Sequence, residues 1–273
     1  MPRHAILEAR LHADQIRAFG LDVRNLDVPI RLKNGLANVE ISGVVNEGQM
    51  HIVPVVDFNQ ESAVLTLASP SNLLHEVQLT DQLSEELLSK IHPLFKGASA
   101  VTGKLNLGLE SFSWPLDPAM RRAAQFEGRM QLTDLHMSTH GLLQKILEAT
   151  KVRERDIDIG SREVQFSCEN ERITCSPLKF EVSDHQVMVV GSMGLDQTLD
   201  YSAQLPVTRE LVGGDAYKYL EGTTIRVPIR GTATNPELNQ NILQEATGDL
   251  LKQAAQKAIQ EKAGKLLEGL FDR

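Results

Sequence analysis

Two histidines, His136 and His140, have the four-residue spacing that places a pair of metal-ligating imidazoles on one face of a helix. The pair lacks the glutamate of an HExxH zinc site, and it straddles a predicted junction between a strand and a helix. Cys168 and Cys175 are the only cysteines, and they lack CxxC spacing. The sequence therefore predicts neither a metal site nor a cofactor.

The two cysteines flank a predicted β-hairpin turn. With Asn170 and Glu171 in the turn, Cys168 would face Ile173, and the two sulfur atoms would be diagonal neighbours on one face. A disulfide would require closely spaced Cα atoms and an oxidising compartment, whereas two buried thiols would require neither. The sequence leaves both states open.

Other candidate reactive groups have simpler structural interpretations. Gly213-Gly214-Asp215 is not followed by the Lys-Ser/Thr of a phosphate-binding loop, so it indicates a chain turn. Asp196 belongs to a predicted turn, and Asp200 to the polar side of a strand. The sequence holds no GxSxG nucleophile elbow. We therefore expect a protein that is not an enzyme.

The composition is that of a folded chain with a mainly aliphatic core. Of its 273 residues 41% are hydrophobic, 23% are charged and only 4% are aromatic. A net charge of −8 and the absence of long Lys/Arg clusters argue against a nucleic-acid partner. The sequence has no stretch of about 20 apolar residues that would span a bilayer, and its first residues are too charged for a signal-peptide core. Two interpretations of the start stay open: a position inside a longer reading frame, or one part of a divided protein.

Alternating apolar residues predict strands in the last third of the chain. One side of the first pair carries Val187, Val189, Gly191, Met193 and Leu195, followed after the "LDQT" turn by Leu199, Tyr201, Ala203 and Leu205. Ile225, Val227 and Ile229 form a third run, in which Pro228 favours a place at or near an edge. Asn235 and Pro236 then have the pattern of an N-cap and a first helical residue.

Earlier segments repeat this pattern of strands and short helices. Asn34-Gly35 lies between alternating runs and predicts a hairpin. Thr80 or Asp81 is expected to cap a helix that ends before Pro93, and Thr139 to cap a helix over residues 142–149. A helical insertion is expected near residues 209–220. We predict a β-rich α+β fold, a curved and mostly antiparallel sheet forming a groove, with a few covering helices and a C-terminal amphipathic helix.

The expected units are residues 1–125, with strands and a helix, residues 126–235, a second β unit, and residues 236–273, the C-terminal helix. The helix carries an apolar stripe with charges opposite and lacks the basic face that anionic lipid would attract. It is therefore expected to pack on the sheet or on a protein partner. Its stripe consists of Ile242, Leu243, Ala246, Leu250, Ala254, Ala258, Leu266 and Leu270.

The segments "GSMGLDQTLDYSAQLPV" and "IRVPIRGTATNPELN" resemble the C-terminal region of the AsmA-like proteins of bacterial envelopes, relatives of TamB. The resemblance is densest between Val187 and Asn239 and rests on structural residues, among them Gly191, Gly231, Asn235 and Pro236. It implies an elongated sheet on the periplasmic side of the cell envelope that supports lipid transport or outer-membrane biogenesis. Members of the family usually have an N-terminal membrane helix, which this sequence lacks.

The resemblance implies that a phospholipid or another acyl lipid is the partner and that it lies along the apolar strand faces. The residues expected to contact it are Val187, Val189, Met193, Leu199, Tyr201, Ala203, Leu205, Ile225, Val227 and Ile229. The alternative is an envelope assembly module that docks a protein through its C-terminal helix without transferring lipid. An open apolar groove would favour the first function. A closed core and an exposed stripe on the final helix would favour the second.

Overall fold

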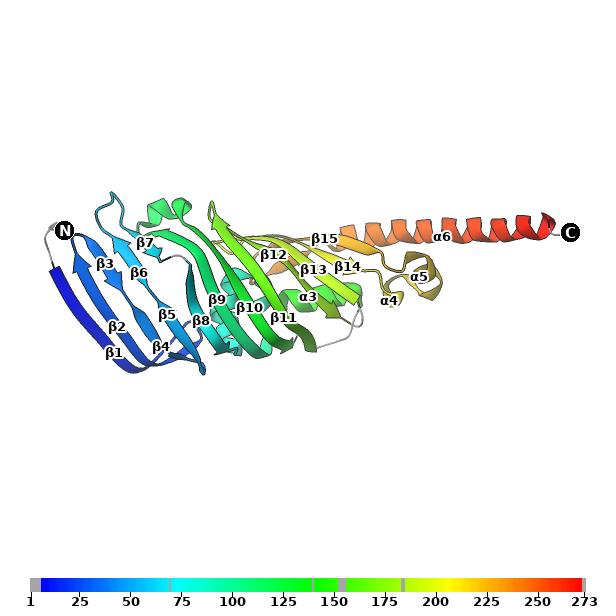
Figure 1. The fold of residues 1–273 in the computed structure, drawn as a ribbon. Coiled ribbons are helices and arrows are strands. Elements are labelled where there is room, and N and C mark those ends of the chain that lie inside the picture. The colour runs from blue at the N-terminus through cyan, green and yellow to red at the C-terminus, as the bar shows by residue number, and fades with distance from the viewer. Residues whose placement is uncertain (1–5, 69, 139, 152–155, 183–184, 272–273) are drawn as a thin grey trace.

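A single curved sheet dominates the protein. The computed structural model describes residues 6–68, 70–138, 140–151, 156–182 and 185–271. Within them, sixteen strands form one antiparallel sheet, and a long C-terminal helix projects beyond it (Figure 1). The predicted fold class, a curved antiparallel sheet with a few helices and a C-terminal helix, is confirmed.

The strands follow one another across the sheet in nearly the order of the chain. They are β1 (Ile6–Ala18), β2 (Leu21–Lys33), β3 (Leu36–Val39), β4 (Ile41–Val45), β5 (Gly48–Ile52), β6 (Pro54–Asp57), β7 (Val64–Leu67), β8 (Ser71–Gln78), β9 (Ser99–Pro115), β10 (Gln125–Ser138), β11 (Asp156–Glu169), β12 (Arg172–Val182), β13 (His185–Gly194), β14 (Leu199–Pro206), β15 (Thr224–Gly231) and β16 (Pro236–Leu238).

Three of the long strands are interrupted, which gives the sheet its only departures from a simple meander. β3 and β4 both pair with β2, β5 and β6 pair with β4 and β3, and β7 and β8 both pair with β9. β3 and β4, β5 and β6, and β7 and β8 therefore each occupy one strand position in the sheet, with a short break between the two segments. From β9 to β16 every strand pairs with the next in sequence. Side chains alternate between the two faces along each regularly paired stretch, and the alternation is interrupted at register shifts such as those between Cys175 and Leu178 on β12 and between Thr133 and His136 on β10.

The turns that the sequence predicted connect these strands. Asn34 and Gly35 have φ values of 52° and 75°, the left-handed backbone of a tight hairpin turn. Asn170 and Glu171 also have positive φ, and Cys168 pairs with Ile173 as expected. Cys168 and Cys175 are free, buried thiols, so of the two open states the structure has the reduced one.

The helices are insertions between strands, and several lie against one face of the sheet. Between β8 and β9 come α1 (Asp81–Leu83), the π-helical η1 (Ser84–Leu88), α2 (Ser89–Ile91) and the 3₁₀ turn η2 (Pro93–Phe95). The other elements are η3 (Pro118–Ala123), α3 (Gly141–Thr150), α4 (Arg209–Val212), α5 (Gly214–Leu220) and α6 (Gln240–Phe271). We call residues 81–95 the helical insert.

Thr80 caps the helical insert, as one of the two predicted alternatives stated. Its Oγ1 accepts a hydrogen bond from the Leu83 amide at 3.1 Å. Because Thr80 is exposed, Thr80→Ala removes little besides this bond and should lower the free energy of unfolding by about 1 kcal/mol. Urea denaturation measures the change. Thr80→Ser keeps the hydroxyl and should retain most of the stability, and an equal loss in both variants would contradict a capping role.

The helix start predicted at Asn235 and Pro236 is wrong. Pro236 begins β16 and pairs with Gly231, and α6 begins at Gln240, where Asn239 Oδ1 accepts from the Ile242 amide at 3.1 Å. Pairing with β15 outweighs the local Asn-Pro capping pattern. The helix predicted over residues 142–149 is present as α3. His140 occupies its N-cap position without a side-chain capping hydrogen bond, and Thr139 lies outside the described residues.

The expected boundary between residues 125 and 126 falls inside β10, after its first residue, and β10 is paired with β9. β9 and β10 pair along their length within the same sheet. Ser113 lies opposite Gln125 at one end, and Ser99 lies opposite Ser138 at the other. Pro228 lies on β15, one strand from the edge, and its carbonyl accepts from the Asn239 amide at 3.2 Å. β16, only three residues long, pairs with β15 beyond this proline.

Candidate binding surface

One face of the sheet is apolar from β1 to β15, and we call it the apolar face. The ten residues expected to contact lipid lie on it in β13, β14 and β15, so they share one face of three neighbouring strands. All ten are buried, with exposed fractions from 0% to 5%. They are Val187, Val189, Met193, Leu199, Tyr201, Ala203, Leu205, Ile225, Val227 and Ile229. Their expected accessibility is not found, and lipid contact at these positions stays a prediction.

The helical insert and α3 cover this part of the apolar face. Leu88 and Phe95 of the insert are completely buried, and so is Ile146 of α3. The Cys175 thiol on β12 donates a hydrogen bond to the Ile91 carbonyl at 3.2 Å. The insert therefore reaches from β9 across to the middle of the second half of the sheet and closes a core there.

Three buried polar side chains meet where the insert crosses the sheet. The ring centroids of His92 and Tyr201 are 5.4 Å apart. Burial lowers the pKa of His92 to about 3 and raises the pKa of Cys175 to about 12. His92 Nδ1 accepts from the Leu94 amide at 3.3 Å, while its Nε2 and the Tyr201 hydroxyl have no hydrogen-bond partner in the described part of the chain. These groups are held neutral, without the solvent access or partner carboxylate of a catalytic acid or base.

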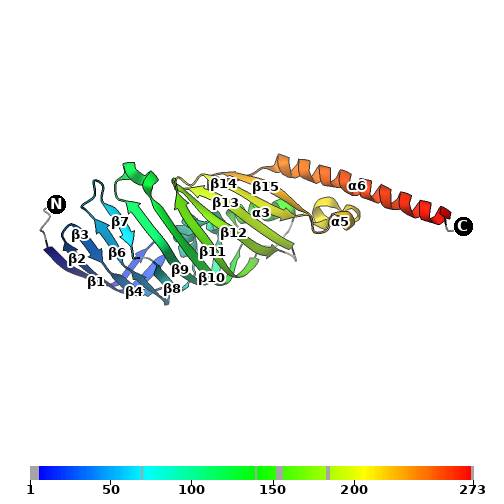
Figure 2. The same cartoon turned by 45° about the horizontal axis from the view of Figure 1, so that its top comes forward.

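In the first half of the sheet the apolar face is open. Leu7 and Leu11 on β1 are 54% and 60% exposed. The face continues over half-buried residues that lie outside the closed core. We define the open face as Leu7, Ala9, Leu11, Ala13, Val28, Ile30, Leu32, Ala37, Val39, Val56, Leu65 and Trp114. Figure 2 shows the strands that carry it, β1, β2, β3, β6, β7 and β9, as parts of one curved sheet.

A single row of directly paired residues crosses the open face without a polar interruption. The row runs through Leu7, Leu32, Ala37, Val56, Leu65 and Trp114, each the Cα partner of the next. Six strands spaced about 4.8 Å apart give the row a length of about 24 Å. Half of a bilayer's hydrocarbon core measures about 15 Å, so an extended apolar chain of that scale fits along the row.

Aromatic rings connect the open face with the closed core. Phe112 stacks with Trp114 at 6.3 Å and with Phe126 at 6.0 Å between ring centroids. Phe126 in turn meets the edge of the Phe166 ring at 6.1 Å. Phe166 is only 5% exposed, whereas the other three rings are half-buried. The apolar face is therefore continuous from solvent into the core.

Charged side chains gather on the opposite, polar face. On β1 and β2, both guanidinium contacts from Arg10 to the Asp27 carboxylate measure 2.7 Å, and Arg31 donates to Glu8 at 3.0 Å. The hydrogen bond from Arg10 lowers the pKa of Asp27. The charged side chains of β1 and β2 therefore pair on the solvent-exposed polar face, and the other face of the same strands stays apolar.

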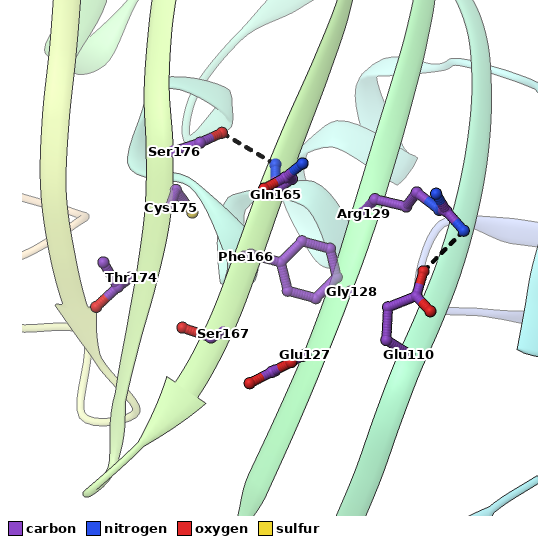
Figure 3. Close-up of a pocket in the computed structure, with 10 residues that line it drawn as sticks. All are labelled: Glu110, Glu127, Gly128, Arg129, Gln165, Phe166, Ser167, Thr174, Cys175 and Ser176. Atoms are coloured by element: carbon purple, nitrogen blue, oxygen red, sulfur yellow. Dashed lines mark hydrogen bonds and ion pairs between the residues drawn. The ribbon is translucent and has the colours of Figure 1, made fainter. Parts of the chain in front are cut away.

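A shallow cavity of about 500 Å³ lies over β10, β11 and β12 and is lined mainly from the polar face (Figure 3). Two of its charged side chains, Glu110 and Arg129, form an ion pair at 2.7 Å. Ser176 Oγ accepts from the backbone amide of Gln165 at 3.0 Å. The lining has no nucleophile beside a base, so we do not assign it a reaction.

The histidine pair singled out by spacing does not form one site. His136 Nε2 lies 3.2 Å from the Asp158 carboxylate, and its pKa is raised chiefly by a hydrogen bond with the Asp134 carbonyl. His140 Nδ1 lies 3.0 Å from Ser99 Oγ. No group of three or more His, Cys, Asp or Glu side chains in the described residues could hold a metal ion.

The residues assigned to geometry do form turns and close contacts. The Gly191 backbone has φ 155°, and the Tyr201 side chain packs directly over it. Gly231 has φ 82°, and it begins a tight turn in which the Asn235 amide donates to the Thr232 carbonyl at 3.1 Å. Pro236 then pairs with Gly231.

Sequence reasoning missed the open face. Leu7, Ala9, Leu11 and Ala13 alternate with charged residues from the start of the described chain, which is the pattern of a half-exposed strand. The charges of this segment exclude a signal-peptide core, and none of its residues was among the predicted lipid contacts. The alternation itself was the signal that could have found the surface.

Comparisons with known proteins give no match: no protein family, no curated protein and no solved structure is similar to this chain. Among the described residues, every helix is too short or too polar to cross a membrane.

Proposed function

We propose that this protein binds lipid acyl chains along its open apolar face. The observation that carries the proposal is the uninterrupted apolar row from Leu7 to Trp114, which is exposed or half-buried while charges occupy the opposite face. Large contiguous apolar surfaces open to water mark binding sites in soluble proteins. A long acyl chain matches this surface in length, in apolar character and in its lack of polar groups.

The mechanism is physical transfer without a chemical step. An acyl chain that leaves water and lies on the open face gains about 25 cal/mol for each Å² of apolar surface removed from water. The surface contains no charged side chain that would favour one head group, so the head group stays at the solvated rim. The aromatic rings of Phe112, Trp114 and Phe126 end the open face where the closed core begins.

We further propose that the protein is of AsmA-like type and works on the periplasmic side of a bacterial cell envelope. The motif between Val187 and Asn239 supports this family, and a long β-sheet with one apolar face is consistent with it. In that setting a phospholipid is the expected ligand, and lipid transport or outer-membrane biogenesis is the expected role.

The test compares charges on neighbouring residues of one strand. Ala37 lies in the middle of the apolar row, while Asn38 points from the polar face of β3 and is exposed. Purified protein is extracted with organic solvent, and its lipids are measured by mass spectrometry. We expect stoichiometric phospholipid in the wild type, about a tenfold loss in Ala37→Asp because a carboxylate would have to be desolvated beside the acyl chain, and no loss in Asn38→Asp.

Circular dichroism and urea unfolding establish that both variants are folded. Equal lipid content in folded Ala37→Asp and Asn38→Asp would show that the open face is not the binding surface. Absence of lipid from the wild type, combined with no uptake from phospholipid vesicles, would refute acyl-chain binding itself.

A second candidate function is docking of a protein partner through α6. Figure 1 shows this helix extending beyond the sheet, and Leu251 and Ile259 on it are 39% and 68% exposed. Its predicted stripe is partly occupied by the protein itself, because Leu243 and Ala254 are buried. Tyr219 of α5 contacts α6 beyond its midpoint, where the Tyr219 hydroxyl donates to Glu261 at 2.8 Å. Leu266 and Leu270 lie where side chains are not described.

A further inference from the structure

The two edges of the sheet differ in how they are protected. At one edge, β16 is three residues long, begins with a proline and is followed directly by α6. At the other edge, β1 has thirteen residues and, among the described residues, pairs only with β2. Long edge strands are usually protected by a proline, a lysine or a charge on the inward face, because their free backbone groups accept another strand.

β1 has none of these protections. Its thirteen residues include no proline, glycine or lysine, and the side facing the apolar surface carries Leu7, Ala9, Leu11 and Ala13. Four large apolar residues of β1 are exposed: Ile6 at 69%, Leu7 at 54%, Leu11 at 60% and Ile16 at 40%. No other described strand exposes as many. The edge has the properties of a surface that forms a β-ladder with a partner strand.

We propose that β1 pairs antiparallel with β1 of a second copy of this chain, with Ala9 on the two-fold axis. In this register Leu7 faces Leu11 of the second copy, and Glu8 faces Arg10 of the second copy. The segment of residues 7–11 is self-complementary in this register, because each apolar residue meets an apolar residue and Glu8 meets Arg10. A two-fold interface requires this, since both copies contribute the same segment. The two sheets become one, and both open faces lie on the same side of it.

The charges on the polar face favour this register over its neighbours. Within one chain Glu8 accepts from Arg31, and Arg10 is bound to Asp27. Placing Glu8 beside Arg10 of the second copy extends these pairs into a row of alternating charge across four strands, Arg31, Glu8, Arg10 and Asp27. Shifting the axis by one residue to Arg10 would place two arginines directly opposite each other, which destabilises a β-ladder. The axis at Ala9 also keeps Leu7, Ala9 and Leu11 of both copies on the apolar face.

Cysteine cross-linking tests both the dimer and its register. In Ala9→Cys the two new thiols face each other across the axis, and mild oxidation should yield a disulfide-linked dimer. In Ala13→Cys, on the same face of the same strand, the two thiols lie eight residues apart along the ladder, about 26 Å, and should not cross-link. The native Cys168 and Cys175 are buried and give little background.

Charge reversal provides a second test without cysteine. Sedimentation velocity of the wild type without lipid should show a concentration-dependent dimer. Glu8→Arg places a cation opposite Arg10 of the second copy twice in each dimer and should raise the dissociation constant about tenfold. Glu127→Arg, an exposed charge reversal on the polar face of β10, is the matched control and should leave the dimer unchanged.

A wild type that is monomeric at every accessible concentration would overturn the proposal. A dimer that cross-links equally well through positions 9 and 13, or in which folded Glu8→Arg is unaffected, would overturn it as well, because association would then use another surface or register. The proposal does not depend on lipid binding. Glu8 lies on the polar face, so a monomeric Glu8→Arg variant that still carries phospholipid would separate the two functions.

Discussion

Replacing Gly191 by alanine is expected to lower the free energy of unfolding by about 3 kcal/mol or more. Gly191 lies at the centre of β13, with φ 155°, a backbone conformation that side-chain-bearing residues rarely adopt. An added Cβ would lie 2.5 Å from the Tyr201 Cα and 2.8 Å from its Cγ. Both atoms are held by the pairing of β13 with β14, so neither can move away at low cost.

The matched control is Gly214→Ala. Gly214 begins α5, has no positive φ, and a Cβ there would meet no atom within 4 Å. This change should be neutral or stabilising by up to about 1 kcal/mol, because alanine has less backbone freedom to lose on folding. Urea denaturation measures both variants. Equal stability of the two would show that Tyr201 does not pack on Gly191 as described.

Local patterns predicted most of the second half of the sheet. The alternation from Val187 to Leu205 required only neighbouring residues, and β13 and β14 follow it in register, with Val189 opposite Ala203. Asn34-Gly35 and Thr80 were also recognisable, because a turn and a cap depend on residues within a few positions. The buried state of Val189 and Val227 was not recognisable, because it depends on a helical insert about a hundred residues earlier in the chain.

The open and closed halves of the apolar face have similar sequence patterns. Leu7, Ala9 and Leu11 alternate as regularly as Val187 and Val189, yet the first group is exposed and the second is buried. Strand periodicity identifies which side chains share a face but not what covers that face. Composition and periodicity therefore predict that the sheet has an apolar face. Which half of that face stays open depends on where the helical insert packs, and this required the three-dimensional structure.

Acid is expected to destabilise this protein through a single buried histidine. The pKa of His92 is lowered from 6.5 to about 3 by burial, so the unfolded chain binds a proton over this range that the folded chain does not. Stability from this group is complete above pH 6.5 and is lost as the pH falls from 6.5 towards 3. The slope is about 1.4 kcal/mol for each pH unit within that window.

Comparison of the wild type with His92→Asn isolates this contribution. Asparagine can still accept the hydrogen bond from the Leu94 amide but does not titrate. Between pH 7.5 and pH 4.5 the wild type should lose about 2 to 3 kcal/mol more than the variant, as measured by urea denaturation at both pH values. His51→Asn, at an exposed position on β5, serves as the control and should behave like the wild type. The same acid loss in wild type and His92→Asn would contradict the burial of His92.

The position of His92 links this loss to the apolar face. His92 belongs to the insert and its ring packs against Tyr201 of the sheet, and protonation there requires either solvent or a partner that the closed core does not supply. The insert should therefore loosen before the sheet unfolds, exposing Val189, Val227 and their neighbours. A rise in the fluorescence of an apolar dye at acidic pH, before the loss of strand signal in circular dichroism, would indicate this order of events. If the dye fluorescence does not rise before the strand signal is lost, or if it rises equally in His92→Asn, protonation of His92 does not loosen the insert.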